Sequence, residues 1–266
     1  MRFLYLLFLI TYSTSIFLSN KHKHQHPNSM KHTIDYTKSG MNWPGVCRSG
    51  VKQSPIAIDK SDRIDKDILD INYGKSGGNF EWNGSFFKID IKDNMSKVKF
   101  LDTIHTPHNQ IEYVLKRVIF RTPPEHIIEG RLHDVEIQLI HETSDKKQIN
   151  NLLIISIFGQ ITNNKKLIDD WWNGIVFDSK ARSSLEGTEK ILDMLKDYFH
   201  YEGSQTVPNC VENVHWIIFK KPILMDPRVI NSLQRNFCEM EFPHGNARHV
   251  QNDNERQVTE YNLKDK

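Results

Sequence analysis

The sequence predicts a mainly β (α+β) fold, with one large sheet and two or three short helices packed on it. Strand-like segments recur from residue 69 to residue 160, and apolar and polar residues alternate clearly in Phe87–Ile91. Residues 152–158 are nearly all apolar, which is typical of a strand buried on both faces. From residue 183 the apolar residues follow helical spacing. Because no change of composition divides residues 36–262, these elements are expected in a single domain.

The elements are predicted in the following order. A loop rich in Gly, Pro and Ser ends in a short strand at 56–58, and six strands follow it, at 69–73, 86–91, 97–101, 111–121, 134–141 and 152–159. A helix is predicted at 183–198 and a further strand at 214–219. Asp226 is a good N-cap and Pro227 suits the first helical position, so a second helix is predicted from there. The tail from residue 243 is polar and is expected to be irregular.

The N-terminal segment has the features of a secretory signal peptide. Arg2 precedes an apolar run from Phe3 to Ile10, and small polar residues follow. We therefore expect residues 1–20 to be a signal peptide, with a mitochondrial presequence as the weaker alternative. Residues 21–33 are rich in His and Lys, and they are predicted to be a disordered spacer or, alternatively, a weak metal-binding tract. The folded domain is then expected at residues 34–262.

The composition of the chain limits which binding partners and which cellular compartment are expected. Lys and Arg total 35 against 33 Asp and Glu, and this balance gives no case for binding nucleic acid. No second apolar run approaches the length of a membrane span. Three cysteines in an oxidising compartment would form one pair and leave one over. Asn83 and Asn94 begin Asn-x-Ser triplets, which makes them candidate glycosylation sites and supports secretion weakly.

Several separate stretches of this chain resemble signatures of the α-class carbonic anhydrases. They run in unbroken order over residues 36–256, and together they are far more specific than any one of them alone. They are Trp43-Pro44-Gly45-Val46-Cys47 with Gln53-Ser54-Pro55-Ile56; Asn83-Gly84; Tyr113-Val114-Leu115-Lys116 with Pro124-Glu125-His126, Glu136 and His141; residues 201–210 with Glu212, Val214 and Trp216; and residues 246–251 with Asn254 and Arg256.

The resemblance implies a large central, mostly antiparallel twisted sheet with short peripheral helices, in agreement with the pattern of apolar residues. It also implies a disulfide between Cys47 and Cys210. Closing a loop of that length is worth roughly 5 kcal/mol before strain. Cys238 then has no partner, and it is expected either to be buried or to link two chains as a disulfide-bonded dimer.

The resemblance places Ile119, Arg121 and Gln138 where the family has three zinc-binding histidines. In the family, zinc lowers the pKa of a bound water so that hydroxide can attack CO₂. Ile119 has no lone pair, Arg121 stays protonated, and the amide oxygen of Gln138 is a weak partner for zinc. No zinc or other cofactor is therefore expected.

Other family positions divide into those lost and those retained. Ser85 stands at the position of the proton-shuttle histidine and does not titrate near neutral pH. Thr206 and Glu125 match the hydroxyl–carboxylate pair that orients the zinc-bound hydroxide. Glu136 matches the acceptor behind the third ligand, and His126 matches a structural histidine. We hypothesise that Arg121 replaces the metal electrostatically and pairs with Glu136 or with Glu125. An alternative is a small anion site formed by Arg121 and Thr206.

The predicted function is that of a catalytically inactive carbonic-anhydrase-related protein. It would be secreted or lie in the lumen of the secretory pathway, as a binding or structural module whose partner is another protein. The alternative is an active zinc carbonic anhydrase, or an esterase, that uses a displaced metal. That alternative needs a replacement cluster drawn from His105, His108, His126, His133 and His141. A third possibility is metal buffering by the His-rich N-terminal segment.

Overall fold

The computed structural model describes residues 34–64, 66–102, 110–145, 147–175, 181–239 and 244–263, with side chains in the last helix described up to residue 234. These residues all belong to one compact unit, Thr33–Lys266. The predicted signal peptide and spacer lie outside the described residues, and so does the segment with His105 and His108.

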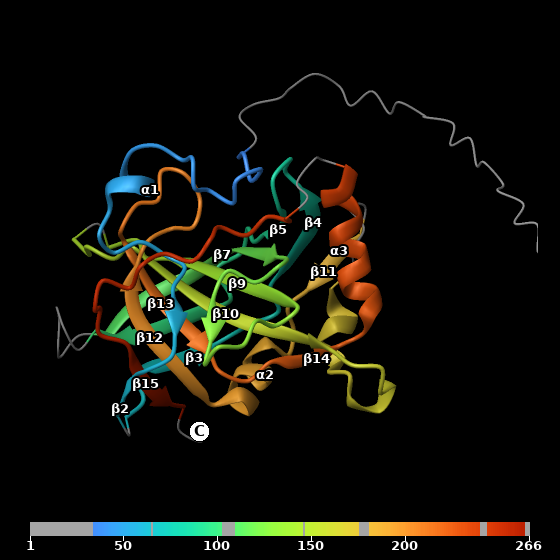
Figure 1. Ribbon diagram of the computed structural model, residues 1–266. Helices are drawn as coiled ribbons and strands as arrows, with labels where there is room; N and C mark the ends of the chain where they lie inside the picture. The colour runs from blue at the N-terminus through green and yellow to red at the C-terminus, as the bar shows by residue number, and fades with distance from the viewer. Residues whose placement is uncertain are drawn as a thin grey trace, which may run out of the picture. The chain divides into compact units, whose positions relative to one another are not determined.

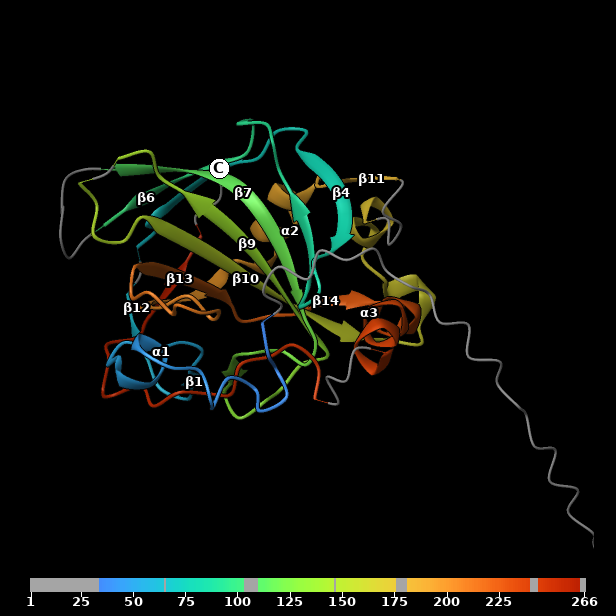
Figure 2. The ribbon, with the colours of Figure 1, turned by 90° about the horizontal axis from the view of Figure 1, so that it is seen from above.

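Thirteen strands in the described part of the chain form one twisted sheet (Figures 1 and 2). They are β2 (Asp62–Arg63), β3 (Leu69–Asn72), β4 (Gly77–Trp82), β5 (Phe87–Asp90), β6 (Lys97–Leu101), β7 (Gln110–Arg121), β9 (Val135–Glu142), β10 (Leu152–Ile161), β11 (Arg182–Ser184), β12 (Asp197–Gly203), β13 (Val214–Phe219), β14 (Ile223–Met225) and β15 (Thr259–Asn262). Two further strands, β1 (Ala57–Ile58) and β8 (Ile127–Ile128), pair with each other.

The order of the strands along the main path of the sheet is β11-β4-β5-β7-β9-β10-β13-β12-β15-β2. Strand β14 adds to β10, and β3 adds to β6, which pairs with β7. Within the described part of this sheet, only the pairs β10–β13, β10–β14 and β15–β2 are parallel, and the separate pair β1–β8 is parallel too. The predicted large and mostly antiparallel sheet is therefore confirmed, and the seven longest predicted strands match observed ones to within two residues.

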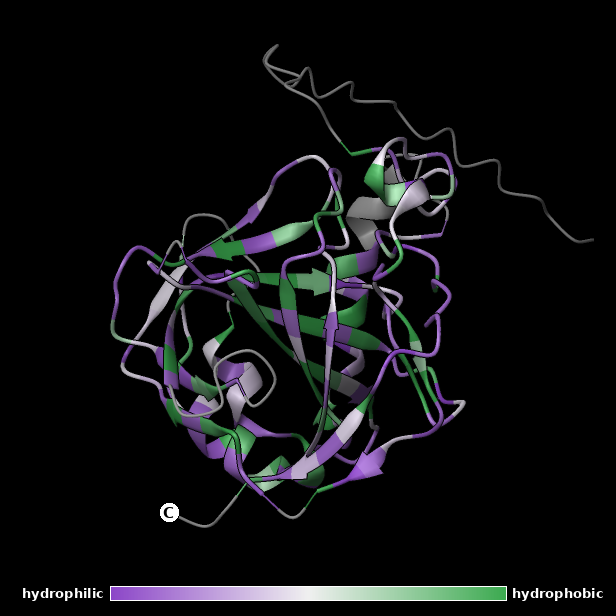
Figure 3. Ribbon diagram, turned by 90° about the vertical axis from the view of Figure 1, so that its left-hand side faces the viewer, coloured by the Kyte–Doolittle hydropathy of each residue, from purple (hydrophilic) through white to green (hydrophobic). Residues whose placement is uncertain are grey.

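Each face of the sheet carries its own apolar core. Val118 and Phe120 of β7 join the larger core, together with Ile217 of β13. The other face carries the smaller core, which includes Tyr201 and Trp216. Successive residues of a strand point to opposite faces, so Ile119 and Arg121 face the side of the smaller core. Figure 3 shows that the central strands are hydrophobic over most of their length.

The helices are short and lie around the sheet. They are α1 (Val46–Ser49), α2 (Thr188–Leu195), α3 (Pro227–Glu239) and two 3₁₀ turns, η1 (Lys165–Leu167) and η2 (Asp170–Gly174). The start of α3 is as predicted, because the Asp226 carboxylate accepts a hydrogen bond from the backbone N of Arg228 at 2.8 Å. Val229 and Leu233 are buried on its inner face.

The predicted helix at 183–198 was wrong at both ends. Residues Arg182–Ser184 form β11 against β4, and Asp197 begins strand β12. Between them α2 starts after Gly187, whose φ of 86° is left-handed, and ends at Leu195, because the following Lys196 has a φ of 54° that breaks the helical path. The helix is limited at both ends by residues that pair with a neighbouring strand. The spacing of apolar residues along the chain cannot show such pairing.

The C-terminal tail was also predicted incorrectly. Thr259–Asn262 form β15, which pairs antiparallel with β12 and parallel with β2. Strand β4 was missed because two glycines, Gly77 and Gly78, open it. At Gly77 an added Cβ would lie 2.3 Å from the carbonyl oxygen of Ser183, so the close approach of β11 requires glycine there.

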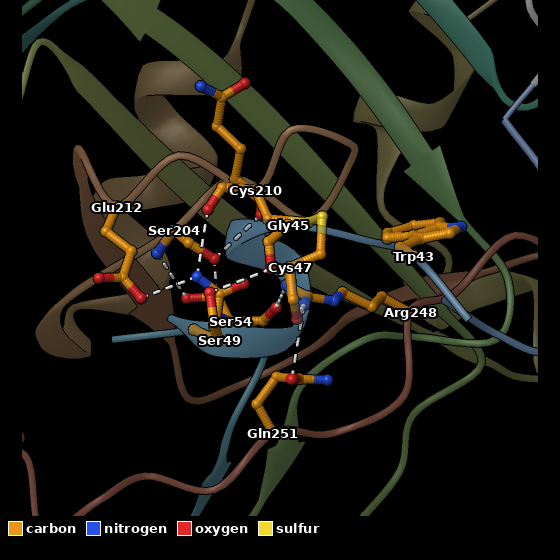
Figure 4. The surroundings of a disulfide bond; sticks show 12 residues. Trp43, Gly45, Cys47, Ser49, Ser54, Ser204, Cys210, Glu212, Arg248 and Gln251 are labelled. Atoms are coloured by element: carbon orange, nitrogen blue, oxygen red, sulfur yellow. Dashed lines mark hydrogen bonds between the residues drawn. A yellow bond between two sulfur atoms is a disulfide. The ribbon is translucent and has the colours of Figure 1, made fainter. Parts of the chain in front are cut away.

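The predicted disulfide between Cys47 and Cys210 is present (Figure 4). It joins α1 to the loop after β12, and neighbouring side chains hydrogen-bond the backbone of both cysteines. Gln53 Nε2 donates to the carbonyl oxygen of Cys210 at 3.1 Å, and Arg248 Nη2 donates to that of Cys47 at 2.7 Å. Cys238 belongs to α3, but its side chain lies outside the described residues. No helix in the described part of the chain is long and apolar enough to span a membrane.

Candidate functional site

The three positions that the resemblance assigns to zinc ligands lie together at the end of β7. The β7–β9 register pairs Ile119 with Gln138 and Arg121 with Glu136. Their side chains therefore share one face of the sheet, as alternation along each strand predicts. Arg121 is 1% exposed, so its guanidinium is buried in the protein.

All three nitrogens of the Arg121 guanidinium donate hydrogen bonds inside the protein. Its Nη1 donates to the Tyr36 hydroxyl at 2.7 Å and to the backbone oxygen of Asn246 at 3.0 Å. Its Nη2 donates to Thr206 Oγ1 at 3.2 Å, and its Nε donates to Gln138 Oε1 at 3.2 Å. The arginine thus connects four segments of the chain that are far apart in the sequence.

Of the two acids considered as partners for Arg121, Glu125 forms the ion pair. Its Oε2 lies 3.4 Å from the Arg121 Nε, and its other oxygen accepts from the backbone N of Arg248 at 2.9 Å. Gln138 Nε2 donates to Glu125 Oε2 at 2.7 Å and to Glu136 Oε1 at 3.1 Å. Gln138 therefore bridges the two carboxylates, and its amide oxygen faces the arginine.

Glu136 is held by a different set of donors. Its carboxylate accepts from the backbone N of Glu125 and of His126, from the His126 ring at 2.9 Å, and from Ser156 Oγ at 2.8 Å. Burial by itself would raise the pKa of Glu136, but the His126 ring and these hydrogen bonds outweigh it and lower the pKa to about 2. The His126 ring also hydrogen-bonds the Tyr201 hydroxyl at 2.7 Å.

Zinc does not fit this set of residues. Burial opposes the charge of Arg121, but Glu125 and Tyr36 outweigh burial and raise the pKa of Arg121 above its usual value. The guanidinium is therefore a permanent cation at a ligand position. The amide oxygen of Gln138 already accepts from it, and Ile119 has no lone pair to offer.

The remaining catalytic positions also have structural partners. Ser85 is buried, and its Oγ accepts from the backbone N of Ile34 at 2.7 Å. Thr206 contacts Arg121 directly, which is the pair considered for a small anion site. In this structure the two groups satisfy each other.

Of the histidines considered for a displaced metal, the three that the structure describes, His126, His133 and His141, each have their own hydrogen-bond partners. The ring of His141 bonds the Tyr73 hydroxyl at 2.5 Å and the Leu153 carbonyl oxygen at 3.1 Å. His133 bonds Gln160 at 3.2 Å. Among the residues that the structure describes, no group of three or more His, Cys, Asp or Glu side chains is arranged to hold a metal ion.

Sequence reasoning missed two partners of Arg121. Tyr36 is fully buried, and its ring packs edge-on against Trp43 at 5.4 Å between centroids. Asn246 supplies its backbone oxygen to Arg121 and its side-chain oxygen to the backbone N of Thr122 at 2.9 Å. Both lie at the ends of the domain sequence, and no local pattern connects them with β7.

The candidate glycosylation sites are both exposed. Asn83 Oδ1 accepts from the backbone N of Ser85 at 3.0 Å and of Phe86 at 2.9 Å. Asn94 Oδ1 accepts from Lys116 Nζ at 2.7 Å. In each case the side-chain oxygen makes these contacts, and it is the amide nitrogen that would carry a glycan.

The fold and these positions together define a domain of the α-carbonic-anhydrase type. The family model described as eukaryotic-type carbonic anhydrase matches residues 37–262, so the chain belongs to this family. Dioscorin dioA3 of Dioscorea japonica is 29% identical over 226 residues, which cover 80% of this chain and 76% of the relative. A carbonic anhydrase of Nostoc sp. is 28% identical over 224 residues, which cover 81% of this chain and 78% of the relative.

Solved structures show the same fold. Dioscorin complexed with ascorbate superposes with a TM-score of 0.63 at 24% identity, covering 83% of this chain and 90% of that one. The α-carbonic anhydrase of Thermovibrio ammonificans in complex with the inhibitor sulfanilamide gives a TM-score of 0.62 at 24% identity. The match covers 80% of this chain and 89% of that one.

Proposed function

We propose that this protein is a non-catalytic member of the carbonic anhydrase family that serves as a binding or structural module. The observation that carries the proposal is the buried guanidinium of Arg121, which stands at one of the three positions assigned to zinc ligands and is ion-paired with Glu125. Its charge takes over the electrostatic role of the metal, because it neutralises a retained acid that would otherwise be buried and unpaired.

The charge of Arg121 also opposes metal binding. A dication about 4 Å from a guanidinium is repelled by about 8 kcal/mol at an effective dielectric constant near 20. Hydration of CO₂ in this family depends on a zinc-bound hydroxide, and the residues at the three ligand positions supply no imidazole. The retained Thr206 and Glu125 then have structural roles as partners of Arg121.

Two measurements on the purified, oxidised protein test this proposal. CO₂ hydration is measured by stopped flow, and zinc content is measured after dialysis. We expect no hydration above the uncatalysed rate. Turnover that depends on bound zinc and is inhibited by sulfanilamide would overturn the proposal.

Restoring the ligands gives a sharper test of the role of Arg121. The triple variant Ile119→His, Arg121→His and Gln138→His is compared with the double variant Ile119→His and Gln138→His, which keeps the arginine. We expect tight zinc binding in the triple variant only, because only there is the competing cation removed. Equal zinc affinity in both variants would show that the charge of Arg121 does not exclude the metal.

The proposal places the protein outside the cell or in the lumen of the secretory pathway, with another protein as its partner. The location is supported by the disulfide between Cys47 and Cys210, by the apolar N-terminal run, and by the exposure of Asn83 and Asn94. Expression in its native cells followed by glycosidase treatment tests this placement. Protein that retains residues 1–20, carries no glycan and remains in the cytosol would refute it.

A further inference from the structure

A cavity of about 240 Å³ lies beside the paired strands β12 and β15. The strand register pairs His200 with Thr259, and Tyr261 is two residues from Thr259 on the same strand. The three side chains therefore share one face of the sheet, and all of them line the cavity. None of the described hydrogen-bond or ion-pair partners of Arg121 lines it. The cavity is thus distinct from the site described above.

The buried walls of this cavity carry polar atoms without a partner in the described part of the protein. His200 is 7% exposed, and Thr259 and Tyr261 are 5% exposed. Neither Thr259 Oγ1 nor the Tyr261 hydroxyl makes a hydrogen bond within the described residues, and His200 bonds His215 through Nε2, which leaves its Nδ1 over. None of these three atoms is fully enclosed by protein, so a molecule in the cavity can reach them. Because buried polar groups cost free energy unless they are hydrogen-bonded, the three atoms favour a polar occupant.

The charges that line the cavity leave one cation without a counter-ion. Lys52 Nζ pairs with Glu202 Oε2 at 3.0 Å. Arg256 also lines the cavity, and its four hydrogen bonds all go to backbone oxygens. Burial lowers the pKa of Arg256, as expected of a cation that lacks a close anion. Burial and the neighbouring His215 also lower the pKa of His200 to about 3, so His200 is uncharged at neutral pH. The lining therefore suits an occupant with one negative charge.

The size and the walls of the cavity limit the occupant further. Pockets for drug-sized ligands measure about 300–1,000 Å³, so a cavity of about 240 Å³ suits a molecule with a single ring. The aromatic residues Tyr201 and Tyr261 line it, and so does Ile64, which is 42% exposed. Apolar surface beside unpartnered hydroxyls fits a ring that has C–H groups on its faces and hydroxyls around its edge.

We propose that this cavity binds a sugar acid of one ring, a molecule with one carboxylate and several hydroxyl groups. Lys52 and Arg256 would hold the carboxylate. Lys52 uses one of its three donors on Glu202, and one of the five N–H groups of Arg256 has no acceptor within the described residues. Sugar hydroxyls both donate and accept, so they can satisfy the three unpartnered atoms of the cavity wall. The site does not depend on the loss of zinc ligands, so it stands or falls separately from the proposed function.

D-Glucuronate is the probe, and the full, oxidised chain is used. Binding is followed by ¹H–¹⁵N NMR at the backbone amides of Gln257 and Thr259 and at the ring nitrogens of His200, which should shift together and saturate. D-Glucose offers hydroxyls without the charge, and propionate offers the charge without hydroxyls. Each should bind at least tenfold more weakly than glucuronate. Absence of saturable shifts, or equal affinity for either partial ligand, would overturn the proposal.

Two variants test the hydroxyls of the cavity wall. Thr259→Val and Tyr261→Phe each remove a hydroxyl that makes no hydrogen bond within the described residues, so each should keep the native Tm. Each should raise the Kd of glucuronate about two- to tenfold, because the bound sugar acid loses one hydrogen bond. The control Thr162→Val removes a hydroxyl outside the cavity and should leave the Kd unchanged. An unchanged Kd in both cavity variants would show that water alone contacts these hydroxyls, and it would refute the site.

A lysine variant tests the charge. The Lys52 side chain is 49% exposed, so Lys52→Gln should fold, and it should raise the Kd of glucuronate at least threefold without changing that of glucose. The control Lys38→Gln removes an exposed lysine that does not line the cavity and should have no effect. Equal effects of the two lysine variants would mean that glucuronate responds to the overall charge of the protein, which contradicts the proposal. If a variant does not fold, the comparison of the three ligands on the native chain still decides.

Discussion

Replacing Arg121 with Met tests whether the guanidinium holds together the positions that the resemblance assigns to zinc ligands. The substitution keeps an unbranched side chain of similar length but removes the charge and all five N–H donors. In the native protein Arg121 makes four hydrogen bonds and one ion pair while its side chain is 1% exposed. The variant leaves the Glu125 carboxylate buried without its cation.

The expected loss of stability follows from that burial. Removing one partner of a buried ion pair costs about 3–5 kcal/mol, since the remaining charge cannot be solvated. The Tyr36 hydroxyl and Thr206 Oγ1 also lose a donor, which adds to the loss. We therefore expect Arg121→Met to lower the free energy of unfolding by at least about 3 kcal/mol. Adding Glu125→Gln should recover part of this loss, because it removes the orphaned charge.

Urea unfolding with the disulfide intact measures this free energy. The matched control is Arg117→Met on the same strand. Arg117 forms an ion pair with Asp90, and its side chain is 45% exposed. An exposed pair of that kind is worth about 0.2–1 kcal/mol. If Arg121→Met costs no more than Arg117→Met, or if Glu125→Gln adds to the loss instead of reducing it, the electrostatic replacement of the metal by Arg121 is refuted.

Two further predictions concern pH and the disulfide. The pKa of Glu136 is lowered in the folded state by the His126 ring and by hydrogen bonds, so its ionisation stabilises the protein above pH about 4.5, and this stabilisation is lost as pH falls toward 2. Glu136→Gln should flatten that part of the stability–pH curve, and an unchanged slope would contradict the assignment. Replacing Cys47 and Cys210 with Ser should cost roughly 5 kcal/mol, since the loop spans 163 residues. A Tm equal to that of the oxidised protein would contradict this.

Local pattern was sufficient for the long central strands. Residues 152–159 are apolar on both faces and were predicted as a buried strand, and β10 is indeed covered by a core on each side. Local pattern failed where pairing partners decided the structure. Thr259–Asn262 are too polar to suggest a strand, yet β12 on one side and β2 on the other satisfy their backbone hydrogen bonds.

For the site, the resemblance assigned Ile119, Arg121 and Gln138 to the ligand positions, and the chemistry of these three side chains argues against zinc. The sequence left open which acid pairs with Arg121. The structure selects Glu125, because Glu136 is already surrounded by its own donors from His126 and Ser156. No spacing rule could show that, since the choice depends on side-chain directions at the end of two paired strands.

The pattern of apolar residues in the sequence was enough to predict one large sheet with short helices. The resemblance carried by the sequence motifs implied the family, the mostly antiparallel sheet and the pairing of Cys47 with Cys210, and it assigned Ile119, Arg121 and Gln138 to the zinc-ligand positions. Only the tertiary structure decided that Tyr36 and Asn246 close over Arg121, and that His200 pairs with Thr259 beside one cavity. Those contacts join residues far apart in the chain, and they exist only once the strands have paired and buried their side chains.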